Sequence, residues 1–377
     1  MKIIIAPDSF KGSLSAIEVG QTIKNAFTHE FKEADIQVVP MADGGEGTVA
    51  ALLFATNGQC MELEAAGPTG QSIPAFYGIL GDRKTVVIEV AGVIGHTLVP
   101  EQERNPLEYT THGVGELIVH ALDNGFRHFI IGLGGSATND GGIGMLHALG
   151  AKFYDQDHNT VTPIAASLSQ VRSVDYKTID PRIWESDVRA ACDVDNPLCG
   201  PNGASFIFGP QKGATVQQIE QLDWGLSVYA DAIEQHLQHC HQFTAGAGAA
   251  GGLGFAFLTI GAELESGASL VGRSTNIEER LSNADWLITG EGRTDEQSLR
   301  GKLPVYLAKT AKEYGVSTIL LSGGVDDKLE SLFDYFDSMH AIANGPLSLE
   351  ASVEKAESLL FHKARNIARL LKRNHSR

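Results

Sequence analysis

The chain has 377 residues, a length that is typical of two globular domains. Hydrophobic residues make up 43% of the chain and charged residues 20%, so a core of useful size is available. The net charge of −17 argues against a nucleic-acid partner, because phosphate backbones are bound by basic patches. An anionic substrate would therefore have to be drawn in by local Lys and Arg side chains.

The four cysteines are widely spaced, which fits neither a zinc site nor a disulfide scaffold. The N-terminal apolar run is interrupted by Asp8 and Lys11 and is too short for a signal peptide. No apolar run reaches the length of a transmembrane helix. We therefore expect a cytoplasmic protein without a membrane partner.

The N-terminal segment has the pattern of two successive strand–loop–helix units. Residues 3–6 form a short apolar run, which is typical of a buried parallel strand, and Ser13 or Ser15 can cap the helix that follows. A second strand is expected over 36–40 and a second helix over 49–55. This pattern begins a doubly wound sheet.

The middle of the chain has a different sequence pattern. Between residues 60 and 90 the sequence alternates and carries turn signals, which predicts antiparallel hairpins. Helices are then expected over 113–124 and 216–238, and strands over 129–132 and 205–208.

From residue 285 the chain returns to the strand–loop–helix pattern of the N-terminal segment. We expect strands over 285–289, 318–321 and 338–342, and helices over 303–314 and 351–372. The last helix carries an apolar stripe, made of Val353, Leu359, Leu360, Ile367, Leu370 and Leu371.

The simplest organisation is discontinuous. Residues 1–60 and 280–377 together would form a flavodoxin-like α/β domain, a doubly wound parallel sheet of strand order 2-1-3-4-5. Residues 61–279 would form a second α/β domain inserted into it. Ligands of such sheets bind at the switch point, which would bring residues 8–13 close to residues 291–295.

Seven short stretches rich in glycine, in charged residues or in both recur along the chain, and together they indicate an enzyme that handles phosphate. They are residues 6–13, 42–48, 132–142, 192–197, 209–213, 246–252 and 289–295. The Walker A pattern is absent, so this is not an ordinary P-loop enzyme. The stretch 132–137 fits the dinucleotide fingerprint, which leaves an NAD-dependent hydroxy-acid dehydrogenase as an alternative.

The stretches 132–142 and 246–252 are candidates for holding triphosphate oxygens through backbone N–H groups. Tight packing of helices or plain turns would also explain their glycines. With a nearby lysine they give the expected nucleotide-binding set, namely Gly134, Gly135, Ser136, Asn139, Lys212, Gly248 and Gly251.

Acidic residues supply candidate Mg²⁺ ligands. Asp193 and Asp195 alternate on an extended segment, so both carboxylates should point the same way. We expect a metal site made by Asp193, Asp195 and Glu291, although a turn at the following Asn-Pro pair would also explain the two aspartates.

The motifs together resemble the bacterial class I glycerate kinase family, essentially from end to end. The resemblance is carried by APDSFKGS at 6–13, ADGGEGT at 42–48, GLGGSATNDGG at 132–142, GPQKGA at 209–214 and TGEGRTD at 289–295. It implies ATP-dependent phosphorylation of D-glycerate, on the 2-hydroxyl to give 2-phosphoglycerate, with Mg²⁺ as cofactor. It also implies a flavodoxin-like domain with a second α/β domain inserted. A 3-phosphoglycerate product, a non-catalytic ligand-binding protein and a homo-oligomer stay open.

We infer the roles of individual residues in glycerate phosphorylation from the chemistry of their side chains. Arg293 and Lys11 would hold the glycerate carboxylate, and Lys11 would also act in catalysis. Asp43 or Asp195 would accept the hydroxyl proton, although Asp43 could instead cap a helix. The remaining substrate-binding candidates are Asp8, Ser13 and Lys302.

Overall fold

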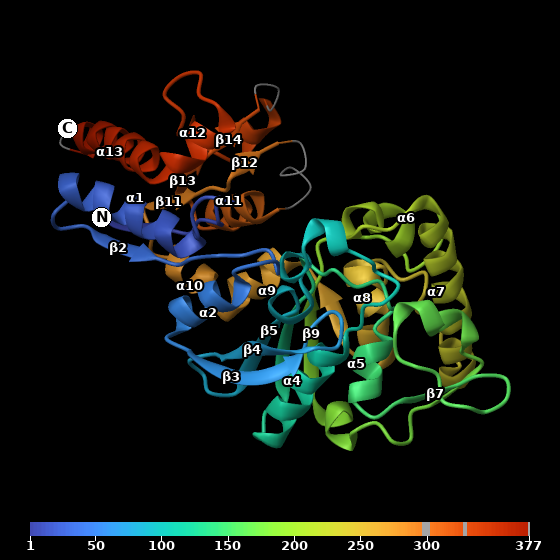
Figure 1. The fold of residues 1–377 in the computed structure, drawn as a ribbon. Helices are drawn as coiled ribbons and strands as arrows, with labels where there is room; N and C mark the ends of the chain where they lie inside the picture. The colour runs from blue at the N-terminus through green and yellow to red at the C-terminus, as the bar shows by residue number, and fades with distance from the viewer. Residues whose placement is uncertain (296–301, 327–329, 376–377) are drawn as a thin grey trace. The chain divides into compact units, whose positions relative to one another are not determined.

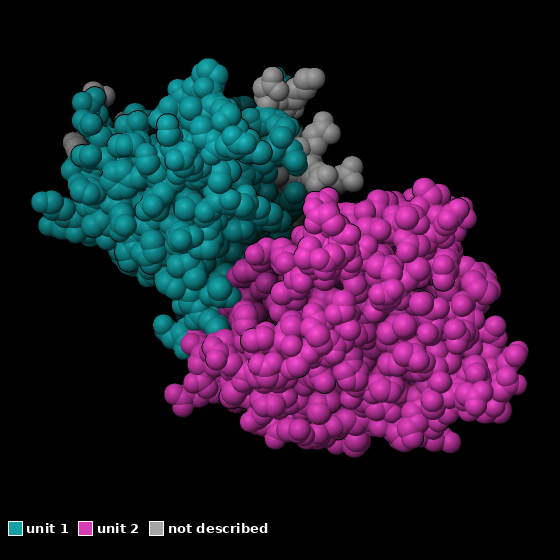
Figure 2. Space-filling view, in the orientation of Figure 1, with its two compact units in different colours: residues 1–43, 50–57, 268–377 teal, residues 44–49, 58–267 magenta. Residues whose placement is uncertain are grey.

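The computed structural model describes residues 1–295, 302–326 and 330–375 (Figure 1). The chain separates into two compact units (Figure 2), which we call unit 1 and unit 2. Unit 1 comprises residues 1–43, 50–57 and 268–377, and unit 2 comprises residues 44–49 and 58–267. The predicted α/β class is confirmed, whereas the domain boundaries at residues 60 and 280 stay a prediction.

Unit 1 contains a five-stranded parallel sheet of order β15-β13-β11-β1-β2. Numbered along the chain, this is the flavodoxin-like order 2-1-3-4-5 that the sequence predicts. The central strands carry runs of buried apolar residues because both faces of the sheet are covered. The strands are β1 (Lys2–Ile5), β2 (Asp35–Val38), β11 (Trp286–Thr289), β13 (Ser317–Ser322) and β15 (Ser338–Ala341).

Helix α1 (Ala16–Glu30) shows how local sequence starts an element. Ser15 accepts a hydrogen bond from the Glu18 N–H, and the Glu18 side chain accepts one from the Ser15 N–H. This capping box satisfies two backbone donors at the start of the helix, so Ser15 rather than Ser13 is the cap.

The expected C-terminal helix is interrupted at Lys355, which separates α12 (Leu349–Glu354) from α13 (Ala356–His375). Helix α13 lies along α1 (Figure 1), and its Leu360 and Ile367 are buried in the shared core. Val353 and Leu370 are exposed, so the predicted stripe is only partly core. The other elements of this part of the chain are α2 (Thr48–Thr56), α9 (Gly267–Ser274), α10 (Ile277–Leu281), α11 (Leu303–Glu313), β12 (Arg293–Thr294) and β14 (Gly324–Val325).

Unit 2 contains a six-stranded mixed sheet of order β10-β9-β6-β5-β4-β3. Strands β3, β4 and β5 are antiparallel neighbours, as predicted, and β5, β6, β9 and β10 run parallel. The strands are β3 (Gln59–Ala66), β4 (Ser72–Ile79), β5 (Thr85–Glu89), β6 (His128–Gly132), β9 (Asp187–Ala191) and β10 (Glu263–Glu265). A separate two-stranded sheet pairs β7 (Lys152–Tyr154) with β8 (Ser173–Asp175).

The strand predicted over residues 205–208 is wrong. Residues 204–208 form the short helix α6 (Ala204–Phe208), in which the Ile207 N–H donates to the Gly203 carbonyl. Periodicity cannot separate a four-residue apolar run in a strand from one in a short helix. The other helices of unit 2 are α3 (Ala91–Ile94), α4 (His112–Asp123), α5 (Ile143–Ala148), α7 (Val216–Leu237) and α8 (Ala249–Thr259). Among the described residues, none of the helices combines the length and the apolar character needed to cross a bilayer.

Candidate active site

The candidate site lies at the switch point of the unit 1 sheet, where β1 and β11 end side by side. The Asp8 N–H donates to the Gly290 carbonyl at 2.8 Å, and the Thr289 hydroxyl donates to the Ala6 carbonyl at 2.8 Å. These bonds bring the loop after β1 against the loop after β11. The predicted proximity of residues 8–13 and 291–295 is therefore observed.

The loop after β11 is fixed by its neighbour β13. The Thr294 hydroxyl donates to the Glu291 carboxylate at 3.1 Å and lies 2.9 Å from the Ser322 hydroxyl. The Gly323 N–H donates to the Glu291 carbonyl at 3.0 Å. Gly290 has no room for a side chain, because a Cβ there would overlap the Leu321 carbonyl oxygen. The sequence of this loop therefore sets the position of Glu291.

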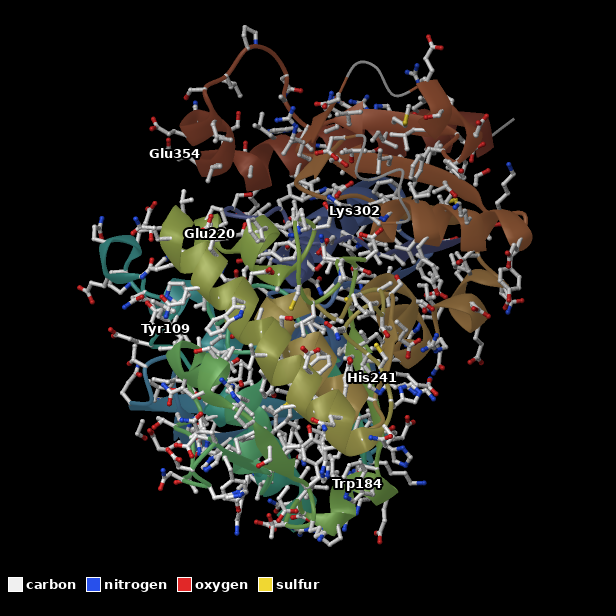
Figure 3. The ribbon with its side chains drawn as sticks, turned by 90° about the vertical axis from the view of Figure 1, so that its right-hand side faces the viewer. Tyr109, Trp184, Glu220, His241, Lys302 and Glu354 are labelled. Carbon is white, nitrogen blue, oxygen red and sulfur yellow. The ribbon has the colours of Figure 1, made fainter. Side chains whose placement is uncertain are left out.

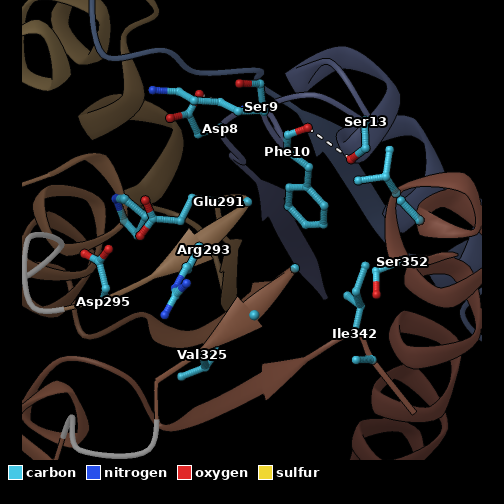
Figure 4. A pocket seen from close by; sticks show the side chains of 18 of the residues that line it. Asp8, Ser9, Phe10, Ser13, Glu291, Arg293, Asp295, Val325, Ile342 and Ser352 are labelled. Carbon is cyan, nitrogen blue, oxygen red and sulfur yellow. Dashed lines mark hydrogen bonds between the residues drawn. The ribbon is translucent and has the colours of Figure 1, made fainter. Parts of the chain in front are cut away.

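A cavity of about 570 Å³ opens at this point, and all of its lining residues belong to unit 1 (Figure 4). Its lining includes every unit 1 residue that was predicted from the sequence to act in catalysis, substrate binding or metal binding. These are Asp8, Lys11, Ser13, Asp43, Glu291, Arg293 and Lys302.

Asp8 is a buried acid of the cavity with a strongly shifted pKa. Burial raises its pKa to about 7, and repulsion from Asp43 and Glu291 acts in the same direction. A hydrogen bond from the Ser9 N–H and the charge of Lys11 oppose this shift. A carboxyl group with such a pKa is partly protonated near neutral pH, so it can donate as well as accept a hydrogen bond.

Lys11 and Asp43 form an ion pair, with the ammonium nitrogen 3.6 Å from a carboxylate oxygen. The Asp43 charge raises the pKa of Lys11, which stays fully charged at neutral pH. Both side chains are accessible, so the pair adds little to folding stability. It places a carboxylate and an ammonium group together in the lining of the cavity.

The remaining cations of the cavity lining are Arg293 and Lys302. Arg293 donates to Asp326 at 2.9 Å, and 71% of its side chain is exposed. Lys302 directly precedes α11 (Figure 3). Ser13 donates through its hydroxyl to the Phe10 carbonyl at 3.0 Å, so it also closes the turn that shapes the first loop.

The expected nucleotide loops belong to unit 2. Lys212 is only 3% exposed, and its ammonium donates to the Ser136 hydroxyl at 3.0 Å and the Thr138 carbonyl at 2.6 Å. Burial lowers the pKa of Lys212 to about 7, against the attraction of Asp140. Lys212 therefore links the loop after β6 to the stretch 209–213 by hydrogen bonds.

The glycines of these loops make close backbone contacts. The Gly134 N–H donates to the Gly44 carbonyl and the Gly248 N–H donates to the Asn196 carbonyl. Gly251 has a φ of +71°, and a Cβ there would overlap the Thr138 carbonyl oxygen. Asn139 is buried and donates to the Ser205 hydroxyl at 2.8 Å. These contacts give the loops a packing role, and their nucleotide-binding role stays a prediction.

The sequence analysis missed the buried acid of this region, Asp140. Its carboxylate accepts hydrogen bonds from the Thr111 N–H and hydroxyl at 2.8 Å and from the Gly142 N–H at 3.0 Å. Burial raises its pKa despite these bonds. Its place between an asparagine and two glycines was the only signal in the sequence, and it does not distinguish a structural acid from a catalytic one.

The expected metal ligands are divided between the units. Asp193 and Asp195 are exposed in unit 2, and Asp193 accepts a hydrogen bond from the Gly267 N–H at 3.0 Å. Glu291 belongs to unit 1. Within the part of the chain that the structure describes, no three His, Cys, Asp or Glu side chains are grouped as a metal site. The ligand set stays a prediction.

The model of the glycerate kinase family matches residues 3–372. The chain belongs to the glycerate kinase family. The resemblance noted in the sequence is therefore confirmed over nearly the whole chain.

Relatives in this family cover the chain from end to end. It is 46% identical to glycerate kinase of Bacillus subtilis, with 99% of this chain and 98% of that protein covered. It is 44% identical to glycerate 2-kinase of Escherichia coli, with 98% of both chains covered. A crystal structure described as glycerate kinase 2 from Salmonella typhimurium LT2 matches with a TM-score of 0.90 at 43% identity, covering 100% of both chains.

Proposed function

We propose that this protein is an ATP-dependent kinase that phosphorylates D-glycerate on its 2-hydroxyl and releases 2-phosphoglycerate. The observation that carries the proposal is the cavity at the switch point, where acids and cations converge in a chain of the glycerate kinase family. The relative from Escherichia coli is named for the 2-kinase, which supports the 2-hydroxyl over the 3-hydroxyl.

The residues of unit 1 suit a small hydroxy acid. Arg293 and Lys11 would hold the carboxylate, with Asp8, Ser13 and Lys302 completing the substrate site. Asp43 would accept the hydroxyl proton, and its partner Lys11 would stabilise charge on the transferring phosphoryl group. Asp195, the alternative base, belongs to unit 2.

The charges of the cavity favour a nucleotide that arrives with Mg²⁺. Five carboxylates line it against three cations, namely Asp8, Asp43, Glu291, Asp295 and Asp326 against Lys11, Arg293 and Lys302. Glu291 offers a nearly buried carboxylate, and Asp193 and Asp195 are the other proposed ligands. When bound, Mg²⁺ would neutralise phosphate oxygens.

The glycine loops of unit 2 stay our proposed contacts for the triphosphate. Gly135 has a φ of +78° and Ser136 accepts from Lys212, so this loop has a fixed shape. We also propose a cytoplasmic location without nucleic-acid or membrane partners, in keeping with the net charge. A homo-oligomer stays an open alternative.

The test is ADP release that requires D-glycerate. We expect the wild-type protein to release ADP from ATP only when glycerate and Mg²⁺ are present, with no absorbance change when NAD is supplied instead. Asp43→Asn should lower kcat by roughly 10²–10⁴ with little change in KM, because general-base catalysis contributes about that much. Asp195→Asn removes a proposed Mg²⁺ ligand, so it should raise the Mg²⁺ concentration needed for half-maximal rate and leave kcat at saturating Mg²⁺ near wild type. The reverse pattern would move the base to Asp195, and NAD reduction without ADP release would refute the kinase.

A further inference from the structure

The cavity of unit 1 has an apolar end as well as a charged end. The apolar end is lined by Phe10, Ile342, Leu349, Val353, Ala356 and Leu359. Figure 4 shows Phe10 and Ile342 on the side away from Glu291, Arg293 and Asp295. A ligand that fills the cavity must therefore present an apolar part and a charged part.

The apolar end combines a buried floor with an exposed rim. Phe10 and Ile342 are almost fully buried, whereas Leu349 is 81% exposed and Val353 is 38% exposed on α12. The rim is held in place by Ser348, whose hydroxyl accepts a hydrogen bond from the Ala351 N–H at 3.2 Å. Apolar side chains that stand in water beside a cavity are stabilised when a ligand covers them.

Glycerate alone does not explain this end of the cavity. Each carbon of the acid carries oxygen, so it offers no apolar surface to Phe10 or Leu349. The volume of about 570 Å³ also lies within the roughly 300–1,000 Å³ that holds ligands far larger than a three-carbon acid. The purine ring of ATP, by contrast, has flat apolar faces that an apolar lining can cover.

We propose that the apolar end of this cavity binds the adenine ring of ATP, so that nucleotide and glycerate share the switch-point cavity of unit 1. The inference rests on the proposed function, in which ATP is the phosphoryl donor. It assigns the base to Phe10, to Ile342 directly after β15 and to residues of α12 and α13, and not to the glycine loops of unit 2.

The test is the affinity for ADP, measured by titration calorimetry with Mg²⁺ present. Leu349→Glu and Val353→Glu place a charge at the rim, and both sites are accessible enough for the fold to tolerate it. We expect each variant to lose at least about tenfold in ADP affinity, since a charge is poorly accommodated against an aromatic ring. The KM for glycerate should change less than about twofold, because the acid binds at the charged end.

Two controls make the result specific. Leu347→Glu changes an exposed leucine two residues from the rim that does not line the cavity, and it should keep wild-type ADP affinity. Adenosine should bind the wild type and lose that binding in Leu349→Glu. Unchanged ADP affinity in both rim variants, or a loss confined to Ser136→Ala in unit 2, would overturn the inference. A wild type that binds ADP and adenosine but phosphorylates no glycerate would refute only the proposed function.

Discussion

Arg293 lines the cavity from β12 and Lys11 from the loop after β1, and each pairs with a carboxylate of unit 1. Their positions are therefore set before a ligand arrives, which reduces the entropy lost on binding. The sequence predicted that they would be close because the ends of adjacent parallel strands meet at one edge. It could not predict their partners, since Asp326 lies on a different loop.

Replacing Arg293 with Ala should raise the KM for glycerate by about 10- to 100-fold and the KM for ATP far less, because a charge-assisted bond to the carboxylate is lost. Stability should change by less than about 1 kcal/mol, since the Asp326 pair is exposed. Arg365→Ala is the control, because that arginine pairs with Glu30 in unit 1 but does not line the cavity. An equal rise in both KM values would mean that Arg293 does not bind the glycerate carboxylate.

Lys212 should make stability depend on pH. Its pKa is about 7 when folded, against 10.5 for an ordinary lysine, so between these values the unfolded chain binds a proton that the folded protein lacks. Stability therefore rises with pH across this window, by at most ~5 kcal/mol at about 1.4 kcal/mol per pH unit. Asp140 is the acid that attracts the charge of Lys212.

The measurement compares urea unfolding of wild type and Lys212→Met at about pH 6.5 and about pH 9.5. The stability of the wild type relative to the variant should increase at the higher pH. Lys152→Met changes an exposed lysine of the same unit and should show no such difference. If the stability of wild type and Lys212→Met changes with pH in parallel, the Lys212 amine stays charged in the folded protein.

At the scale of elements, loop position is decided by backbone contact as much as by side chains. The Gly290→Ala variant should lose about 1–3 kcal/mol and bind glycerate more weakly, because a Cβ there forces the Glu291 loop away from β13. Gly345→Ala is the control, since that glycine of unit 1 has open space around it and does not line the cavity. Urea unfolding and the KM for glycerate report both effects, and equal behaviour of the two variants would contradict this account.

Elements could be predicted where apolar runs were long or bounded by turn residues. Strands β1, β11 and β13 were found because buried parallel strands are apolar throughout. Residues 205–208 were assigned wrongly because a four-residue run carries no period. The break at Lys355 was missed because the apolar spacing continues across it.

At the scale of the molecule, the order of the unit 1 sheet could be predicted from chain order and right-handed crossovers. The charged end of the cavity followed from that order. The apolar end could not be predicted, because Phe10 lies more than 300 residues before Ile342 and Leu349 and meets them only in the folded unit. Their sequence pattern is that of ordinary core residues.

The central claim is the transfer of phosphate from ATP to the 2-hydroxyl of D-glycerate. It is tested most directly by phosphorus NMR of the purified protein with ATP, Mg²⁺ and D-glycerate. We predict that the γ-phosphate signal declines while the signal of 2-phosphoglycerate grows in step with ADP. A 3-phosphoglycerate signal would contradict the assigned hydroxyl, and ATP that stays intact would contradict the kinase itself.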